Sequence, residues 1–225
     1  MKDASTMAAR RTEILDRIAA ASRQAGVPEP QLIAVSKVQP DDRVRAALAA
    51  GQTVFGENRV QEAQGRWGER FAHERDRLEL HLIGPLQTNK AKEACALFDV
   101  IQTLDREKLA RALLKAADRV GRMPRLMVQV NIGEEDQKSG LAPDDLGTFL
   151  DRLDAEYGLR PEGLMCIPPL EAPAAPHFWR MEKLANAHGL DGLSMGMSAD
   201  YETAVAFGAT HVRVGSALFG AREPV

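Results

Sequence analysis

Short apolar stretches alternate with stretches of helical periodicity along most of this chain. Apolar residues at adjacent or alternate positions predict buried strands, whereas apolar residues spaced three and four apart predict helices. Strands that alternate with helices build a parallel sheet, and eight such repeats favour closure into a barrel. We therefore predict an α/β fold, a single (β/α)8 TIM barrel with an extra N-terminal helix. The predicted strands cover residues 32–37, 53–56, 80–84, 99–102, 125–131, 163–167, 192–198 and 211–216.

The segment before the first strand is expected to be the extra helix. Ile14 and Ile18 recur at helical spacing, Ser5 or Thr6 can cap its beginning, and Gly26 marks its end. Helices between the strands are expected at residues 41–50, 60–71, 88–97, 106–120, 144–157 and 175–188.

A length of 225 residues suits one barrel domain. No change in composition suggests a linker. The proline-rich segment 167–176 follows the sixth predicted strand, so we expect it to be a loop at the mouth of the barrel, the end where the strands finish. We expect residues 1–225 to form a single domain.

Charge and composition exclude several classes of function. The net charge is only −3, and basic residues are mixed with acidic ones, which argues against a nucleic-acid-binding surface. Cys95 and Cys166 lie far apart in apolar surroundings, and the five histidines show no metal-ligand spacing, so we expect neither a disulfide nor a metal. No stretch resembles a signal peptide or a membrane span, so we expect a cytoplasmic protein.

The last two predicted strands each end in small polar residues that precede a helical stretch. Ser198 follows the first of them, and Gly215 and Ser216 follow the second. Backbone N–H groups at such turns stabilise an anion, and the turns after the last two strands of a TIM barrel commonly bind phosphate. Arg213 lies two residues before Gly215, so strand alternation can point it at the same ligand. A small phosphorylated molecule is the predicted ligand.

Lys37 ends the first predicted strand and therefore faces the same mouth. Lysine at a strand end is usually only solvated. If Ile33, Val35 and Phe55 partly desolvate it beside a bound phosphate ester, its amine becomes a candidate Schiff-base nucleophile. Pyridoxal 5′-phosphate (PLP) would combine an aldehyde for Lys37, a phosphate for the turns and a ring nitrogen for Arg213.

Arg213 has two interpretations, a surface charge at a strand end or the partner of the ring nitrogen. A guanidinium has no accessible proton to give, so a pyridine nitrogen beside it stays unprotonated. The cofactor would then be a weak electron sink, suited to racemisation or to no catalysis.

Several segments match one known family. They are IAVSK at 33–37, FGENRVQE at 55–62, HLIGPLQTNK at 81–90, VNIG at 130–133 with KSG at 138–140, GLM at 163–165, and the whole stretch 193–220. Together they resemble the pyridoxal phosphate homeostasis proteins, also called the PLP-binding protein or proline synthetase co-transcribed family. The match spans nearly the full chain, and the last segment is the most specific.

The resemblance implies a fold like the N-terminal barrel of alanine racemase, with PLP held on Lys37 and Arg213 at the ring nitrogen. Asn58 matches a position near the cofactor, although it could equally cap a helix. Met195 could pack on the ring, although a core methionine is the simpler interpretation. The implied phosphate contacts come from Ser198, Gly215 and Ser216.

The resemblance also implies a role in intracellular PLP homeostasis, in which the protein buffers PLP or delivers it to apo-enzymes without catalysis. Alanine racemases carry a further domain whose tyrosine acts as a base, and we expect no such domain here. The tyrosines, Tyr157 and Tyr201, are both predicted on helices, so no second acid or base is evident for racemisation. We therefore expect a monomeric carrier.

Three alternatives remain. The first is a PLP-dependent amino-acid racemase, which an acid or base on the 167–176 loop would favour. The second is a barrel enzyme acting on a sugar phosphate, which leaves Lys37 unexplained. Within the carrier hypothesis, Lys138 could be a second PLP acceptor, or simply a solvated loop lysine.

Overall fold

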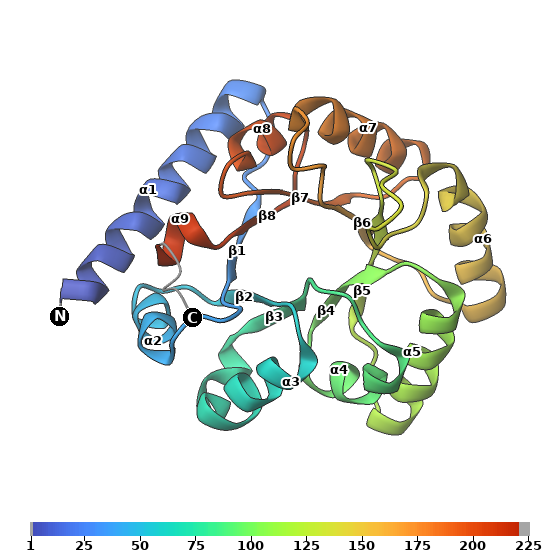
Figure 1. Ribbon diagram of the computed structural model, residues 1–225, viewed down its shortest axis with the longest axis horizontal. Helices are drawn as coiled ribbons and strands as arrows, with labels where there is room; N and C mark the ends of the chain where they lie inside the picture. The colour runs from blue at the N-terminus through green and yellow to red at the C-terminus, as the bar shows by residue number, and fades with distance from the viewer. Residues whose placement is uncertain (1, 221–225) are drawn as a thin grey trace.

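Eight parallel strands form a closed barrel in chain order, and helices surround it (Figure 1). The computed structural model describes residues 2–220. Strand β1 pairs with both β2 and β8, which closes the barrel. The predicted (β/α)8 TIM barrel is therefore confirmed. The strands are β1 (Gln31–Val35), β2 (Val54–Glu57), β3 (Glu79–Leu82), β4 (Val100–Leu104), β5 (Arg125–Val130), β6 (Gly163–Cys166), β7 (Gly192–Met197) and β8 (His211–Val214).

The helices follow the strands as expected, and one extra helix, α1, precedes β1. Helix α1 packs against α2, α8 and α9 on the outside of the barrel (Figure 1). It begins at Lys2, so Ser5 and Thr6 lie inside the helix and the expected cap there is wrong. The α-helices are α1 (Lys2–Ala25), α2 (Asp41–Ala49), α3 (Val60–Ala63), α4 (Ala91–Leu97), α5 (Glu107–Val120), α6 (Leu146–Tyr157), α7 (Ala174–Ala187), α8 (Tyr201–Ala206) and α9 (Ser216–Phe219).

Short 3-10 and π-helical segments complete several of the expected helices. The segments are η1 (Gln64–Arg70), η2 (Ala72–Arg77), η3 (Thr88–Lys90) and η4 (Pro143–Asp145), and η1 is a π-helix while the others are 3-10 helices. Most of the stretch 60–71, expected as one α-helix, is thus a short α-helix followed by a π-helix.

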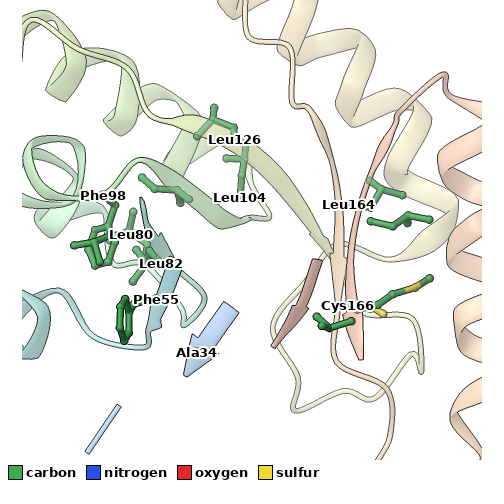
Figure 2. Packing of buried hydrophobic residues seen from close by; sticks show 14 of the residues in the cluster. Ala34, Phe55, Leu80, Leu82, Phe98, Leu104, Leu126, Leu164 and Cys166 are labelled. Atoms are coloured by element: carbon green, nitrogen blue, oxygen red, sulfur yellow. The ribbon is translucent and has the colours of Figure 1, made fainter. Parts of the chain in front are cut away.

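The hydrophobic core lies between the barrel and its helices. Phe55, Leu80, Leu82 and Phe98 gather on one side of it (Figure 2). Trp67 of η1 is fully buried, and its ring centroid lies 4.8 Å from that of Phe55. Burial of each such side chain contributes about 2 kcal/mol to stability. This packing holds the strands rigidly, so the residues at their ends keep fixed relative positions.

Two structural features bear on the classes of function considered above. Among residues 2–220, no helix combines the length and the apolar character that a membrane span requires. The same residues contain no cluster of three or more His, Cys, Asp or Glu side chains placed to hold a metal ion.

Candidate functional site

The ends of β1 and β8 meet at the mouth of the barrel. In the β1–β8 pairing, Arg213 lies opposite Ile33 and Val214 opposite Ala34. A Cβ atom added at Gly215 would lie 3.5 Å from the Cβ of Val35. The turn that carries Lys37 and the turn that begins at Gly215 are therefore neighbours at the same end of the barrel.

A buried arginine holds the turn that carries Lys37. Arg66 of η1 donates from Nη1 to the carbonyl of Ser36 at 2.6 Å and from Nη2 to the carbonyl of Gln39 at 2.5 Å. These two carbonyls flank Lys37 and Val38, and Val38 has a φ of 53°, a left-handed conformation that costs energy for a β-branched residue. The guanidinium thus stabilises a turn whose backbone is strained. Lys37 itself is half-buried.

Glu57 at the end of β2 anchors that arginine. Its Oε1 accepts hydrogen bonds from Arg66 Nη1 at 2.8 Å, Ser36 Oγ at 2.7 Å and Trp67 Nε1 at 3.0 Å. Glu57 is 0% exposed and Arg66 is 6% exposed, so this is a buried ion pair. A buried charge is tolerated only when it is paired and hydrogen-bonded, as it is here.

The sequence did not single out Glu57 and Arg66, although both support the turn that carries Lys37. A carboxylate at the end of a fully buried strand needs a buried partner, and that requirement was the available signal. Its partner could not be chosen from the sequence, because Arg66 and Trp67 reach inward only through the π-helical winding of η1. π-Helical turns occur preferentially at functional sites.

Ser198 and the Gly215 turn form a compact group of polar atoms. Ser198 Oγ accepts hydrogen bonds from the backbone N–H of Gly215 at 3.2 Å and from that of Ala217 at 3.3 Å. Ser216 is exposed between them. Helix α9 is only four residues long, so its dipole adds little, and the hydroxyl groups of Ser198 and Ser216 are the donors that would favour an anion here.

Gly196 shapes the turn that leads to Ser198. Its φ is +88°, and an added Cβ would lie 2.5 Å from Ala204 Cβ and 2.9 Å from Tyr201 Cα. Only glycine fits both this conformation and this close approach to α8. The β7–β8 register also shifts between Ser194 and Met197, just before the turn that carries Ser198.

Arg213 lies inside the barrel. Of the two interpretations that the sequence allowed for it, the surface charge is therefore wrong. Arg213 is 3% exposed, and burial lowers its pKa. Nη1 donates to Ser194 Oγ at 2.7 Å, and Nη2 donates to the carbonyl of Cys166 at 2.6 Å. Burial also raises the pKa of the Cys166 thiol to about 12, so this thiol is a poor nucleophile.

Asn58 lies at the mouth, where it lines the same cavity as Lys138. The N-cap of α3 is Arg59 and no side chain caps this helix, so Asn58 is not the helix cap that the sequence allowed. A cavity of about 270 Å³ opens beside it, lined by residues that include Gly84, Gln129 and Lys138. Lys138 Nζ contacts Glu135 Oε2 at 2.5 Å and donates to the carbonyl of Pro168 at 3.2 Å. Lys138 is therefore held at the cavity and is not simply solvated.

Met195 is fully buried in the core between the barrel and the helices. Its neighbour Ser194 points into the barrel, where it contacts Arg213. Successive residues of a strand face opposite sides, so this placement favours the simpler interpretation of a core methionine. Packing of Met195 on a bound ring stays a prediction without support from its surroundings.

Both tyrosines lie on helices of the outer layer, Tyr157 at the end of α6 and Tyr201 at the start of α8. Tyr157 on α6 donates to Glu107 Oε2 at 3.3 Å. The ring of Tyr201 on α8 lies 5.6 Å from the guanidinium carbon of Arg17 on α1. These contacts hold the ring of Tyr157 against α5 and the ring of Tyr201 against α1.

Comparison with known proteins agrees with this geometry. Over residues 11–223, the chain matches the protein family described as alanine racemase, N-terminal domain. It is 42% identical over 229 residues to the pyridoxal phosphate homeostasis protein of Pseudomonas aeruginosa, with 97% of each chain covered.

Two solved structures of one related protein share the fold. PipY of Synechococcus elongatus PCC7942 without PLP is 41% identical, with a TM-score of 0.80 over 92% of this chain and 100% of that chain. PipY with PLP bound is 40% identical, with a TM-score of 0.76 and the same coverage. These similarities confirm the resemblance inferred from the sequence motifs.

Proposed function

Because the chain belongs to the alanine racemase N-terminal domain family and, within it, to the pyridoxal phosphate homeostasis proteins, we propose that it binds PLP reversibly. In this proposal the protein contributes to PLP homeostasis by holding the cofactor and delivering it to apo-enzymes. The binding of PLP by the related PipY supports the choice of ligand.

The convergence of three kinds of polar group at one end of the barrel carries the proposal. The primary amine of Lys37, the guanidinium of Arg213, and the donors around Ser198 and Gly215 lie on the ends of β1, β7 and β8. When bound, PLP supplies an aldehyde that condenses reversibly with a primary amine, and a ring that can accept electrons. Each part of PLP thus has a matching protein group. Asn58 and Ser216 would add contacts at the rim.

Arg213 fits the ring nitrogen for a specific reason. Of its five N–H donors, two make the hydrogen bonds described above to residues within 2–220, so others are available to a ligand. No carboxylate within that range forms an ion pair with it, and the positive charge is therefore not neutralised by a direct contact. A guanidinium donates a hydrogen bond to a pyridine nitrogen without protonating it, which leaves the ring a weak electron sink.

The same geometry supports a carrier more than a catalyst. Racemisation requires an acid or base on each face of the substrate, within hydrogen-bond reach. Lys37 can be one, and both tyrosines are in the outer layer. Lys138 at the mouth cavity is the residue that keeps a racemase as the second candidate. A carrier can equally use Lys138 as a second amine during transfer.

A transfer experiment tests the proposed function. The protein is saturated with PLP, freed of excess ligand, and mixed with an apo-form of a PLP-dependent enzyme whose recovered activity is followed. We expect wild type to retain PLP and reactivate the enzyme, and Lys37→Ala to retain much less. Chiral chromatography of amino acids incubated with the loaded protein provides the second readout. Steady turnover that depends on Lys37 would replace the carrier with the racemase.

Two further properties belong to this proposal. We propose that residues 1–225 act as one PLP-binding domain and as a cytoplasmic monomer. Sedimentation velocity with and without PLP measures the oligomeric state, and a single species at the mass of one chain is expected. A dimer in both states would contradict the monomer.

A further inference from the structure

A line of hydrogen-bonded side chains crosses the interior of the barrel behind Arg213. Its members lie on four different strands, β8, β7, β4 and β3. The contacts are Arg213 Nη1 to Ser194 Oγ at 2.7 Å, Ser194 Oγ to Gln102 Oε1 at 2.6 Å, Gln102 Nε2 to His81 Nδ1 at 2.7 Å, and His81 Nε2 to Glu79 Oε1 at 2.6 Å. All except Glu79 are buried. We refer to these five residues as the barrel chain.

The donors and acceptors in the barrel chain give it one direction. Arginine has only donors, so Ser194 Oγ accepts from Arg213, and the single hydroxyl hydrogen of Ser194 goes to Gln102 Oε1. The amide nitrogen of Gln102 then faces His81 Nδ1 and must donate to it. His81 is therefore neutral, with its hydrogen on Nε2, from which it donates to Glu79.

Neutral groups hold the guanidinium of Arg213 on both sides. Ser194 Oγ accepts from Nη1, and the carbonyl of Cys166 accepts from Nη2. Asp200 is the acidic residue that acts on Arg213 through space, and its Oδ1 accepts the backbone N–H of Met197 at 2.6 Å. The orientation of Arg213 is thus set by the barrel chain and one carbonyl, rather than by an ion pair.

We propose that Ser194, Gln102 and His81 are positioning residues that orient Arg213 toward the ring nitrogen of bound PLP. This inference rests on the proposed function. Each member has one hydrogen-bonding role that its neighbours require, so the loss of an inner member frees the hydroxyl of Ser194 to turn. Arg213 then loses a fixed acceptor and with it a fixed direction. A line of buried polar groups that served stability alone would not affect the bound ligand in this way.

Variants of the barrel chain test the proposal. Ser194→Ala removes the acceptor of Arg213, Gln102→Met breaks the chain at a distance from it, and Ser194→Thr retains the hydroxyl. Met165→Leu is the matched control, because Met165 is fully buried opposite Ser194 on the neighbouring strand β6 and is not a member of the barrel chain. For each variant we measure the dissociation constant of PLP, the absorption maximum of the bound ligand and the midpoint of urea unfolding.

The expected pattern separates positioning from stability. Ser194→Ala and Gln102→Met should weaken PLP binding roughly tenfold, because a charge-assisted hydrogen bond is lost or misaligned, and both should shift the absorption maximum. Ser194→Thr should restore both values, and Met165→Leu should match wild type. An unchanged absorption maximum and affinity in folded Ser194→Ala and Gln102→Met would overturn the proposal, and so would an equal change in Met165→Leu.

A measurement on the ligand-free protein tests the barrel chain independently of PLP. The ¹⁵N NMR shifts of the His81 ring should show a neutral imidazole with its hydrogen on Nε2 at neutral pH. A hydrogen on Nδ1 would contradict the direction of the chain and the proposal with it, even if a variant failed to fold. If wild type binds no PLP, the proposed function fails, whereas PLP binding that the chain variants leave unaltered defeats only this inference.

Discussion

At the scale of single residues, Glu57 supports the turn that carries Lys37. It holds Arg66, which in turn holds the carbonyls on both sides of Lys37. The turn that carries the amine is therefore fixed by a buried ion pair and not by its own backbone preference. An amine in a fixed position meets an aldehyde with less loss of entropy than a mobile one.

Replacement of Glu57 tests this role. Glu57→Gln keeps the size of the side chain but leaves Arg66 with only the more distant carboxylate of Asp41, whose Oδ1 lies 3.7 Å from Nε. The loss of the buried partner should reduce the free energy of unfolding by about 3 kcal/mol. The release of PLP should also become faster, because the Lys37 turn is held less firmly. Urea unfolding and stopped-flow release of PLP measure the two effects.

Glu62→Gln is the control for that prediction. Glu62 forms an exposed ion pair with Arg59 at 3.4 Å. Such a pair contributes little, so stability should change by no more than about 0.5 kcal/mol and PLP release should be unaltered. If Glu57→Gln behaved like Glu62→Gln, the buried pair would not hold the turn.

Residues with local signals could be placed from the sequence, whereas residues whose role depends on register could not. Lys37, Ser198, Arg213 and Gly215 follow strands directly, and the order of strands in a barrel brings them to one end. The contact of Gln102 with Ser194 joins residues 92 positions apart, and it depends on the register of β4 against distant β7. No local pattern specifies that register.

At the scale of elements, the turn at the end of β7 depends on one glycine. Gly196 combines a φ of +88° with close contact to α8. Gly196→Ala should reduce the free energy of unfolding by about 2–4 kcal/mol, because the left-handed backbone and the overpacking each have a cost. It should also weaken PLP binding by displacing Ser198. Urea unfolding and PLP titration measure both changes.

Gly158 offers the matched comparison. Its φ is +60°, but an added Cβ meets no atom within 4 Å. Gly158→Ala should therefore show only the backbone cost, about 1 kcal/mol, and normal PLP binding. Equal losses of stability in the two variants would show that the contact with α8 is unimportant.

The elements themselves were largely predictable, and the exception has a physical cause. All eight strands and most helices lie within a few residues of their expected positions. The stretch 60–71 has apolar residues at helical spacing, so it was expected as one α-helix. Gly65 and Gly68 lower helix propensity there, and the burial of Arg66 and Trp67 stabilises the wider π-helical turn. Propensity alone cannot anticipate that gain from packing.

At the scale of the whole molecule, two groups whose shifted pKa values make stability depend on pH lie at the end of the barrel opposite the mouth. Burial lowers the pKa of His211 to about 4, and the ring of His81 lies 5.6 Å from it. The hydrogen bond with His81 lowers the pKa of Glu79 to about 2. The positive charges of Arg125 and Arg213 also lower the pKa of His211. Arg125 contacts Glu79 at 2.9 Å.

These two groups predict a loss of stability in acid. The neutral form of His211 is favoured in the fold, so its contribution is complete above pH 6.5 and is lost as the pH falls toward 4, at a cost of roughly 3 kcal/mol. The contribution of Glu79 is complete above pH 4.5 and is lost as the pH falls toward 2. Urea unfolding between pH 8 and pH 3 should show both declines.

His211→Asn identifies the source of the first decline. Asparagine does not titrate, so the unfolding free energy of this variant should be nearly constant between about pH 6.5 and pH 5. A decline as steep as that of wild type would assign the effect to another group.

Lys37 is the amine on which we propose that the barrel holds PLP. Borohydride reduction of the PLP-loaded protein, followed by peptide mass spectrometry, locates the bond directly. We predict one modified site at Lys37, and no modification at the mouth when Lys37→Ala is loaded at the same PLP concentration. Modification chiefly at Lys138 or another lysine, or no modification at all in wild type, would contradict the assignment of Lys37 as the amine that binds PLP.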